Sequence, residues 1–167
     1  MNIGAIRILG VDPGLRNTGW GLIEQRGSRL GFVACGSIHT ETNLELAERL
    51  AHIHRELTQL IEAREPQEGA VEETFVNRDP QSALKLGQAR GVALAALSLG
   101  GLRVAAYSAN LVKKTVVGVG HAEKDQVAMM IKILLPSSEA RTPDAADALA
   151  VAICHAQHRV ARARGAA

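Results

Sequence analysis

The spacing of apolar residues changes after about residue 40, and this change restricts the folds that the chain can adopt. Three early stretches, 6–11, 19–23 and 30–38, are short and rich in aliphatic residues, which predicts β-strands. Residues 25–28 predict a hairpin turn between the second and third of them. Beyond these strands the apolar residues recur at helical spacing, at Leu46, Leu50, Ile53, Leu57 and Leu60. The chain is therefore expected to begin with a strand meander and to continue with a helix.

The rest of the chain alternates between strand and helix patterns. The expected elements are, in order, a strand ending at Glu72, a helix over 81–97, a strand over 102–106, a helical stretch broken at 118–120, a helix around 127–134 and a last helix from Thr142. A meander followed by this alternation predicts an α/β fold with a mixed five-stranded sheet and helices on both faces. The trailing arginines, Arg159, Arg162 and Arg164, are expected to be solvated on an end that frays after about residue 160, with phosphate contact as the alternative.

Length and composition set the broad class of protein. At 167 residues, the chain suits one domain over 1–167, and its net charge of +2 gives no overall argument for nucleic-acid binding. Cys35 and Cys154 have no CxxC partner, so small core residues are expected rather than a disulfide or a zinc site. No apolar run is long enough to span a bilayer, and no signal peptide is evident. We expect a cytoplasmic protein.

Four acidic residues stand where the predicted elements begin or end. Asp12 and Glu72 terminate predicted strands, and the carboxyl ends of strands are where open α/β sheets bind ligands. Asp144 and Asp147 are three residues apart in the first turns of the last helix, so they share a face. Four carboxylates at one edge would repel one another unless cations lay between them. Such oxygen ligands select Mg²⁺ or Mn²⁺.

Each acid also has an ordinary structural interpretation. Asp12, before Pro13 and Gly14, is a typical turn former. Asp144 follows Thr142 and Pro143 in a normal helix start, where a negative charge favours the helix dipole. Asp147 lies past the positions that best serve the dipole, which favours a functional role. No one of these features is specific, whereas their combination is.

That combination resembles the RuvC-type crossover-junction endodeoxyribonucleases, which resolve Holliday junctions and share the ribonuclease-H-like fold. The resemblance runs in order along essentially the whole chain, and its most specific part is the ten-residue run SALKLGQARG. The matching segments are 10–14, 18–21, 71–75, 82–91, 112–118, 122–124 and 143–150.

The resemblance implies the roles of individual residues. Asp12, Glu72, Asp144 and Asp147 would be the catalytic carboxylates and metal ligands. We expect two Mg²⁺ ions in each active site, with Mn²⁺ able to substitute. Asp12 is assigned to bridge both ions, Glu72 to one side, and Asp144 and Asp147 to the other. Because Glu73 is also acidic, and strand side chains alternate, only one of the pair can face the metals. The motif favours Glu72.

The resemblance also implies residues that contact DNA. Lys113 and Lys124 would contact phosphates, and Lys114 lies beside them at the glycine-bearing loop. A solvated basic patch is the alternative. Phe75 follows Glu72 by three positions and would stack on a base at the junction, although a core phenylalanine is also compatible with the pattern. His121 and His158 are weak candidates for a general acid.

The implied substrate is a four-way DNA junction, cut by paired symmetric nicks during homologous recombination and DNA repair. Two nicks need two sites, so the family implies a homodimer with two-fold symmetry. The family also implies association with a branch-migration motor of the RuvA and RuvB type.

Three alternatives differ in class. An actin-like sugar kinase or ATPase has a similar first loop but needs two lobes, which 167 residues cannot supply. A ribonuclease-H-type enzyme acting on RNA in a hybrid is disfavoured by the lysines and by SALKLGQARG. A non-catalytic nucleic-acid-binding module is disfavoured because all four carboxylates are present.

Overall fold

The computed structural model of the chain describes residues 4–73 and 79–165. Five strands and five helices account for most of these residues. The strands are β1 (Ile6–Asp12), β2 (Asn17–Arg26), β3 (Arg29–His39), β4 (Glu68–Glu72) and β5 (Arg103–Tyr107). The helices are α1 (Leu46–Arg64), α2 (Pro80–Leu99), α3 (Ala109–Val117), α4 (Lys124–Leu134) and α5 (Pro143–Gly165).

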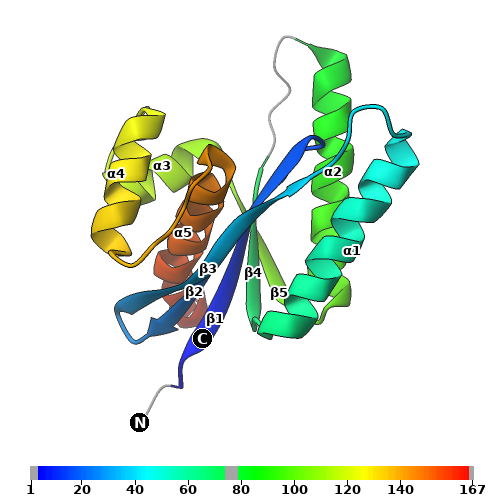
Figure 1. Cartoon of the computed structure of the whole chain (residues 1–167). Helices are drawn as coiled ribbons and strands as arrows, with labels where there is room; N and C mark the ends of the chain where they lie inside the picture. Colours follow the sequence, from blue (N-terminus) through cyan, green and yellow to red (C-terminus); the bar gives the residue numbers. More distant parts are fainter. Residues whose placement is uncertain (1–3, 74–78, 166–167) are drawn as a thin grey trace.

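The five strands form one mixed sheet in the order β3-β2-β1-β4-β5. The meander of β1, β2 and β3 is antiparallel, whereas β4 and β5 run parallel to β1. The carboxyl ends of β1, β4 and β5 therefore lie at the same edge of the sheet (Figure 1). The predicted mixed five-stranded sheet is confirmed.

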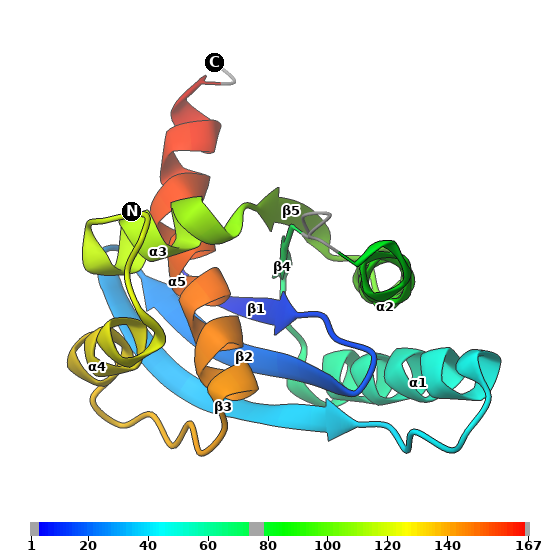
Figure 2. The ribbon, with the colours of Figure 1, turned by 90° about the horizontal axis from the view of Figure 1, so that it is seen from above.

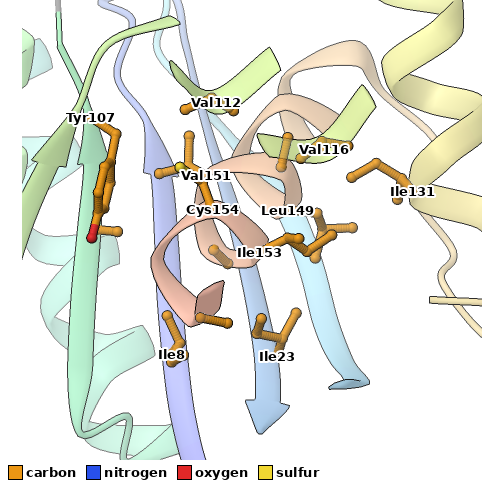
Figure 3. Close-up of a cluster of buried hydrophobic side chains, with 14 of the residues drawn as sticks. Ile8, Ile23, Tyr107, Val112, Val116, Ile131, Leu149, Val151, Ile153 and Cys154 are labelled. Carbon is orange, nitrogen blue, oxygen red and sulfur yellow. The ribbon is translucent and has the colours of Figure 1, made fainter. Parts of the chain in front are cut away.

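Helices cover both faces of the sheet, as expected. Figure 2 shows α1 and α2 on one side and α3, α4 and α5 on the other. Successive side chains of β1 point alternately toward the two helix layers, because strand side chains alternate between the faces of a sheet. Ile8 packs toward α5 with Leu149 and Ile153 (Figure 3), while Leu9 belongs to the core beneath α1 and α2. The apolar periods seen in the sequence thus build two cores on one sheet.

Helix α5 packs directly on the sheet because three glycines, Gly10, Gly19 and Gly21, line its path. A Cβ atom at Gly10 would overlap the backbone of Ala148 and Ala152. At Gly21 it would lie 2.8 Å from the side chain of Leu149. Gly10 and Gly21 face each other across β1 and β2, so they form one shallow channel under the helix. Close packing of this kind requires the absence of a side chain.

The strands and helices begin and end close to the predicted residues, with small shifts. The second strand extends from Asn17 to Arg26, beyond the expected 19–23, because its polar outer residues still pair with β1 and β3. The first helix ends as expected before Pro66, with Glu65 in the left-handed region at φ 50°. Among the described helices, none is both long and apolar enough to cross a membrane.

One expectation about the last helix is wrong. Arg159 is not solvated on a frayed end, because its guanidinium makes two hydrogen bonds of 2.7 Å to the buried carboxylate of Glu68. The backbone is helical to Gly165. The error has a physical reason: the partner of Arg159 lies 91 residues away in β4, and nothing near Arg159 in the sequence indicates it.

Candidate active site

Two of the predicted carboxylates lie at the ends of neighbouring strands. Strands β1 and β4 are parallel, with Val11 in register with Val71. Asp12 and Glu72 each follow by one residue and end their strands. A hydrogen bond joins their side chains. Because both strands run the same way, the fold places these two acids side by side.

The other two carboxylates come from the first turns of α5, at the same edge. The helix begins because the hydroxyl of Thr142 accepts a hydrogen bond of 3.2 Å from the backbone N–H of Ala145, which is the predicted N-cap. The start of the helix reaches the sheet at Gly19, where a Cβ atom would overlap the backbone of Asp144. Gly19 pairs with Asp12 across β1 and β2. The fold therefore brings Asp144 close to Asp12.

Three of the four carboxylates have raised pKa values. The pKa of Asp12 is raised from its ordinary 3.8 to about 8, first by burial and then by repulsion from Glu72, Asp147 and Asp144. A buried acid surrounded by acids holds its proton, because a second negative charge in the same place is unfavourable. The charges of the other three predicted residues thus all act on Asp12, and the four form a single acidic cluster.

Glu72 and Asp147 show the same effect, moderated by lysines. Burial and the charge of Asp147 raise the pKa of Glu72, against the hydrogen bond from Asp12 and the charges of Lys113 and Lys124. Burial also raises the pKa of Asp147, and Lys124 opposes the rise. These carboxylates are held in the fold at an electrostatic cost.

A divalent cation fits this chemistry. Carboxylate oxygens are the ligands that Mg²⁺ and Mn²⁺ prefer, and a cation would remove the repulsion that raises these pKa values. In the described part of the chain, no three acidic, histidine or cysteine side chains are close enough together to hold one ion. The four acids are nevertheless near enough for their charges to act on one another.

The predicted lysines flank the acids. Lys124 begins α4, and its Nζ lies 3.8 Å from a carboxylate oxygen of Asp147. Lys113, on α3, is half-buried, and its charge acts on both Glu72 and Asp147. Lys114 is exposed and is not among the charges that shift these acids. The structure therefore brings Lys113 and Lys124 to the acidic cluster and leaves Lys114 outside it.

The register of β4 decides between the two neighbouring glutamates. Glu72 faces Asp12, whereas Glu73 is exposed. The backbone N–H of Glu73 donates a 2.8 Å hydrogen bond to the carbonyl of Tyr107, which continues the pairing with β5. Phe75, the predicted stacking residue, lies outside the described residues.

Three supporting hydrogen bonds were not predicted. The Nε of Arg90, inside the SALKLGQARG run, donates to the backbone carbonyl of Glu72 at 3.3 Å. On the other side of the site, Thr40 and Arg49 both donate to the carbonyl of Leu15, three residues after Asp12. These contacts hold the chain on either side of the acids. The conspicuous SALKLGQARG run was the only sequence signal for the first of them.

The other candidate residues lie elsewhere. His158 contacts the hydroxyl of Thr115 at 3.1 Å and packs against the ring of Tyr107, while His121 is exposed. Neither is among the charges that act on the acidic cluster. Cys154 is fully buried, as expected of a core residue, and Cys35 is half-buried against the same core.

Known proteins match this chain in sequence and in fold over most of its length. The family described as "Crossover junction endodeoxyribonuclease RuvC" matches residues 8–155. RuvC of Methylocella silvestris is 68% identical over 163 residues, covering 98% of this chain and 93% of that protein. The structure of T. thermophilus RuvC in complex with a Holliday junction substrate is 33% identical, covers 92% of this chain and 94% of that chain, and has a TM-score of 0.86.

A more distant structure shares the fold alone. The yeast mitochondrial Holliday junction resolvase Ydc2 is 14% identical and has a TM-score of 0.68, over 96% of this chain and 84% of that chain. A mixed sheet of this order, with acids at the ends of its first and fourth strands, defines a ribonuclease-H-like nuclease. Within that class, the chain belongs to the RuvC family of crossover junction endodeoxyribonucleases. It is a nuclease of DNA recombination and repair that resolves Holliday junctions, and the kinase and non-catalytic alternatives are excluded.

Proposed function

We propose that this nuclease hydrolyses junction phosphodiesters with divalent metal ions held by Asp12, Glu72, Asp144 and Asp147. One observation carries the proposal: burial and three neighbouring carboxylates raise the pKa of Asp12 to about 8. A divalent cation at the cluster would relieve this repulsion and stabilise the ionised carboxylates. When bound, Mg²⁺ or Mn²⁺ activates water and neutralises charge on the phosphate.

The protein's own residues supply position and charge. Asp12 and Glu72 are fixed by the sheet, and Asp144 and Asp147 by the helix that crosses it. Lys124 offsets the negative charge of Asp147 from one side, so an anionic DNA strand is not simply repelled by the cluster. Lys113 has the same effect from α3. We propose that these two lysines bind the phosphates that flank the cleaved bond.

We further propose the assembly and its surroundings. A four-way junction has two equivalent strands to cut, whereas the described part of one chain offers one acidic cluster. A homodimer with two-fold symmetry would therefore make the paired nicks. Phe75, three residues after Glu72, would stack on a base at the junction centre. A RuvA and RuvB type branch-migration motor would present the junction, and the cytoplasm would be the compartment. The family assignment supports these statements.

One assay tests the substrate and the metal requirement together. The purified protein is mixed with a labelled four-way junction, a linear duplex of the same sequence, or an RNA–DNA hybrid, each with Mg²⁺, Mn²⁺ or excess chelator. We expect cleavage of the junction alone, only with metal, by symmetric nicks. Undiminished cutting in chelator would overturn the metal proposal. Preferential cutting of the hybrid would instead favour a ribonuclease acting on RNA.

A further inference from the structure

Helix α5 carries two of the four acids, so its position along the sheet sets the geometry of the site. Part of its contact with β1 and β2 is made by glycines, at Gly10, Gly19 and Gly21, against helix backbone and the side chains above them. The rest is apolar packing, such as that of Ile8 with Leu149 and Ile153. The glycines allow close approach. At these three glycines the strands have no side chain to interlock with the helix, so there they resist sliding along the helix axis only weakly.

A buried ionic cluster joins the other half of this helix to the sheet. Glu68 begins β4, and its side chain is 5% exposed. Two nitrogens of Arg159 donate to its two carboxylate oxygens, both at 2.7 Å, in a forked arrangement. His155, one helical turn earlier, contacts the same carboxylate through Nε2 at 2.8 Å. Both partners belong to α5, so Glu68 fixes the helix at two successive turns.

The cluster also reaches the strand ends that form the active site. The hydroxyl of Tyr107 makes a 2.9 Å hydrogen bond with Nδ1 of His155. Tyr107 is in register with Glu72, and its carbonyl accepts the hydrogen bond from Glu73. In Figure 3 its side chain runs down along the sheet, to the left of the helix. A continuous set of contacts therefore connects Glu68, α5 and the carboxyl end of β4.

The charge on Glu68 makes this connection firm. Hydrogen bonds from Arg159 and His155 lower the pKa of Glu68 from 4.5 to about 2, against the effect of burial. The carboxylate is consequently ionised at any pH near neutrality. A buried carboxylate that lost its partners would be strongly unfavourable, so the helix cannot shift without breaking charged hydrogen bonds.

We propose that Glu68, Arg159 and His155 are positioning residues for catalysis: they fix α5 along the sheet and so hold Asp144 and Asp147 beside Asp12 and Glu72, where the proposed metal ions would bind. The inference rests on the proposed metal site. Arg159 and Asp147 are twelve positions apart, about 18 Å along a helix. A rigid helix transmits the constraint over that length, and loss of it would loosen the metal site without removing a ligand.

Two arginines offer a matched test. Arg103, on β5, also donates to Oε1 of Glu68 at 2.7 Å, but it does not belong to the helix. Arg159→Gln and Arg103→Gln each remove one arginine from the same carboxylate, and only the first removes a contact between that carboxylate and α5. For each variant we would measure the Mg²⁺ concentration that gives half-maximal junction cleavage, the metal-free junction affinity and the thermal unfolding temperature.

We expect Arg159→Gln to raise the required Mg²⁺ concentration roughly tenfold, the low end of what lost support costs at metal sites. Its cleavage rate should recover at saturating Mg²⁺, and its junction affinity should be unchanged. Arg103→Gln should keep the wild-type requirement. Equal shifts in both variants, or lower thermal stability of Arg159→Gln with an unchanged requirement, would overturn the inference. Should Arg159→Gln not fold, Arg159→Lys and Arg103→Lys allow the same comparison.

Failure of the proposed metal site would look different. Wild-type cleavage in excess chelator, or full activity of Asp12→Asn, would refute the site itself. A metal-dependent wild type in which Arg159→Gln keeps its normal Mg²⁺ requirement would refute only the positioning role.

Discussion

The backbone carbonyl of Asp144 lies directly over Gly19, so close that a methyl group added to the glycine would overlap it. This contact joins the start of α5 to the strand position opposite Asp12. Gly19 takes part in no chemistry itself. Its contact with α5 nevertheless sets the distance between the acids on the strands and the acids on the helix.

Gly19→Ala is therefore expected to impair cleavage more than stability. The helix start must move away from the sheet, at a cost of about 1–3 kcal/mol for overpacking, and Asp144 moves with it. We expect metal-dependent junction cleavage of the folded protein to fall at least about tenfold. Gly31→Ala is the control, since the nearest atom to its Cβ is 3.9 Å away. Normal cleavage by Gly19→Ala would show that this contact does not set the site.

Asp147→Asn tests a carboxylate with the least change of shape. The fold should survive, metal-free junction binding should be equal or tighter because one negative charge is removed, and cleavage in Mg²⁺ should fall by roughly two orders of magnitude or more. Thermal unfolding, junction affinity and cleavage are measured on one preparation. Asp125→Asn, which changes an exposed acid of α4, is the control. A stable Asp147→Asn protein that cuts at the wild-type rate would remove Asp147 from the site.

The raised pKa of Asp12 predicts a pH-dependent gain in stability for Asp12→Asn. In the unfolded chain Asp12 ionises near pH 4, and in the metal-free folded protein near pH 8. The folded protein binds the extra proton between these values, so the contribution of Asp12 to stability is lost as the pH rises through this window. Asparagine has no such loss.

In chelator, we expect urea unfolding to show a larger stability gain for Asp12→Asn over wild type at pH 8 than at pH 5. Glu62→Gln, at an exposed position on α1, should show no such difference. The same gain at both pH values would mean that Asp12 is not held at a raised pKa.

Metal binding should stabilise the folded protein and depend on the same acid. Mg²⁺ at the cluster removes the repulsion between carboxylates, so the thermal unfolding temperature at pH 8 should rise with Mg²⁺ concentration. Asp12→Asn should abolish most of this rise. Calcium should also stabilise the wild type but support little cleavage, because its irregular coordination positions water poorly. A rise that is equal in wild type and Asp12→Asn would place the ion elsewhere.

The two lysines at the cluster should differ from their neighbour. Lys113→Ala and Lys124→Ala should each weaken junction binding and reduce the slope of log affinity against log salt by about one, because each lost phosphate contact releases fewer counterions. Lys114→Ala is the matched control, since Lys114 is adjacent in sequence, exposed, and outside the cluster. Identical slopes for all three variants and wild type would argue against phosphate contact by Lys113 and Lys124.

The sequence by itself determined which elements form and where the acids stand on them. The apolar periods and the turn residues after Asp12 gave the strand end, and Thr142 and Pro143 gave the helix start, because strand pairing, capping and turn formation are governed by nearby residues. The mixed sheet and the family were predictable for the same reason. Each sequence motif that indicated them lies on a single element and can be recognised from neighbouring residues.

Only the tertiary structure decided how those elements meet. The register of β4 selected Glu72 over Glu73, and the glycines under α5 set its distance from the sheet. The partnership of Glu68 with His155 and Arg159 spans 87 and 91 residues. A buried charge is stable only beside its partner. The residues near Arg159 in the sequence do not indicate that partner, because packing brings the carboxylate of Glu68 to it from far along the chain.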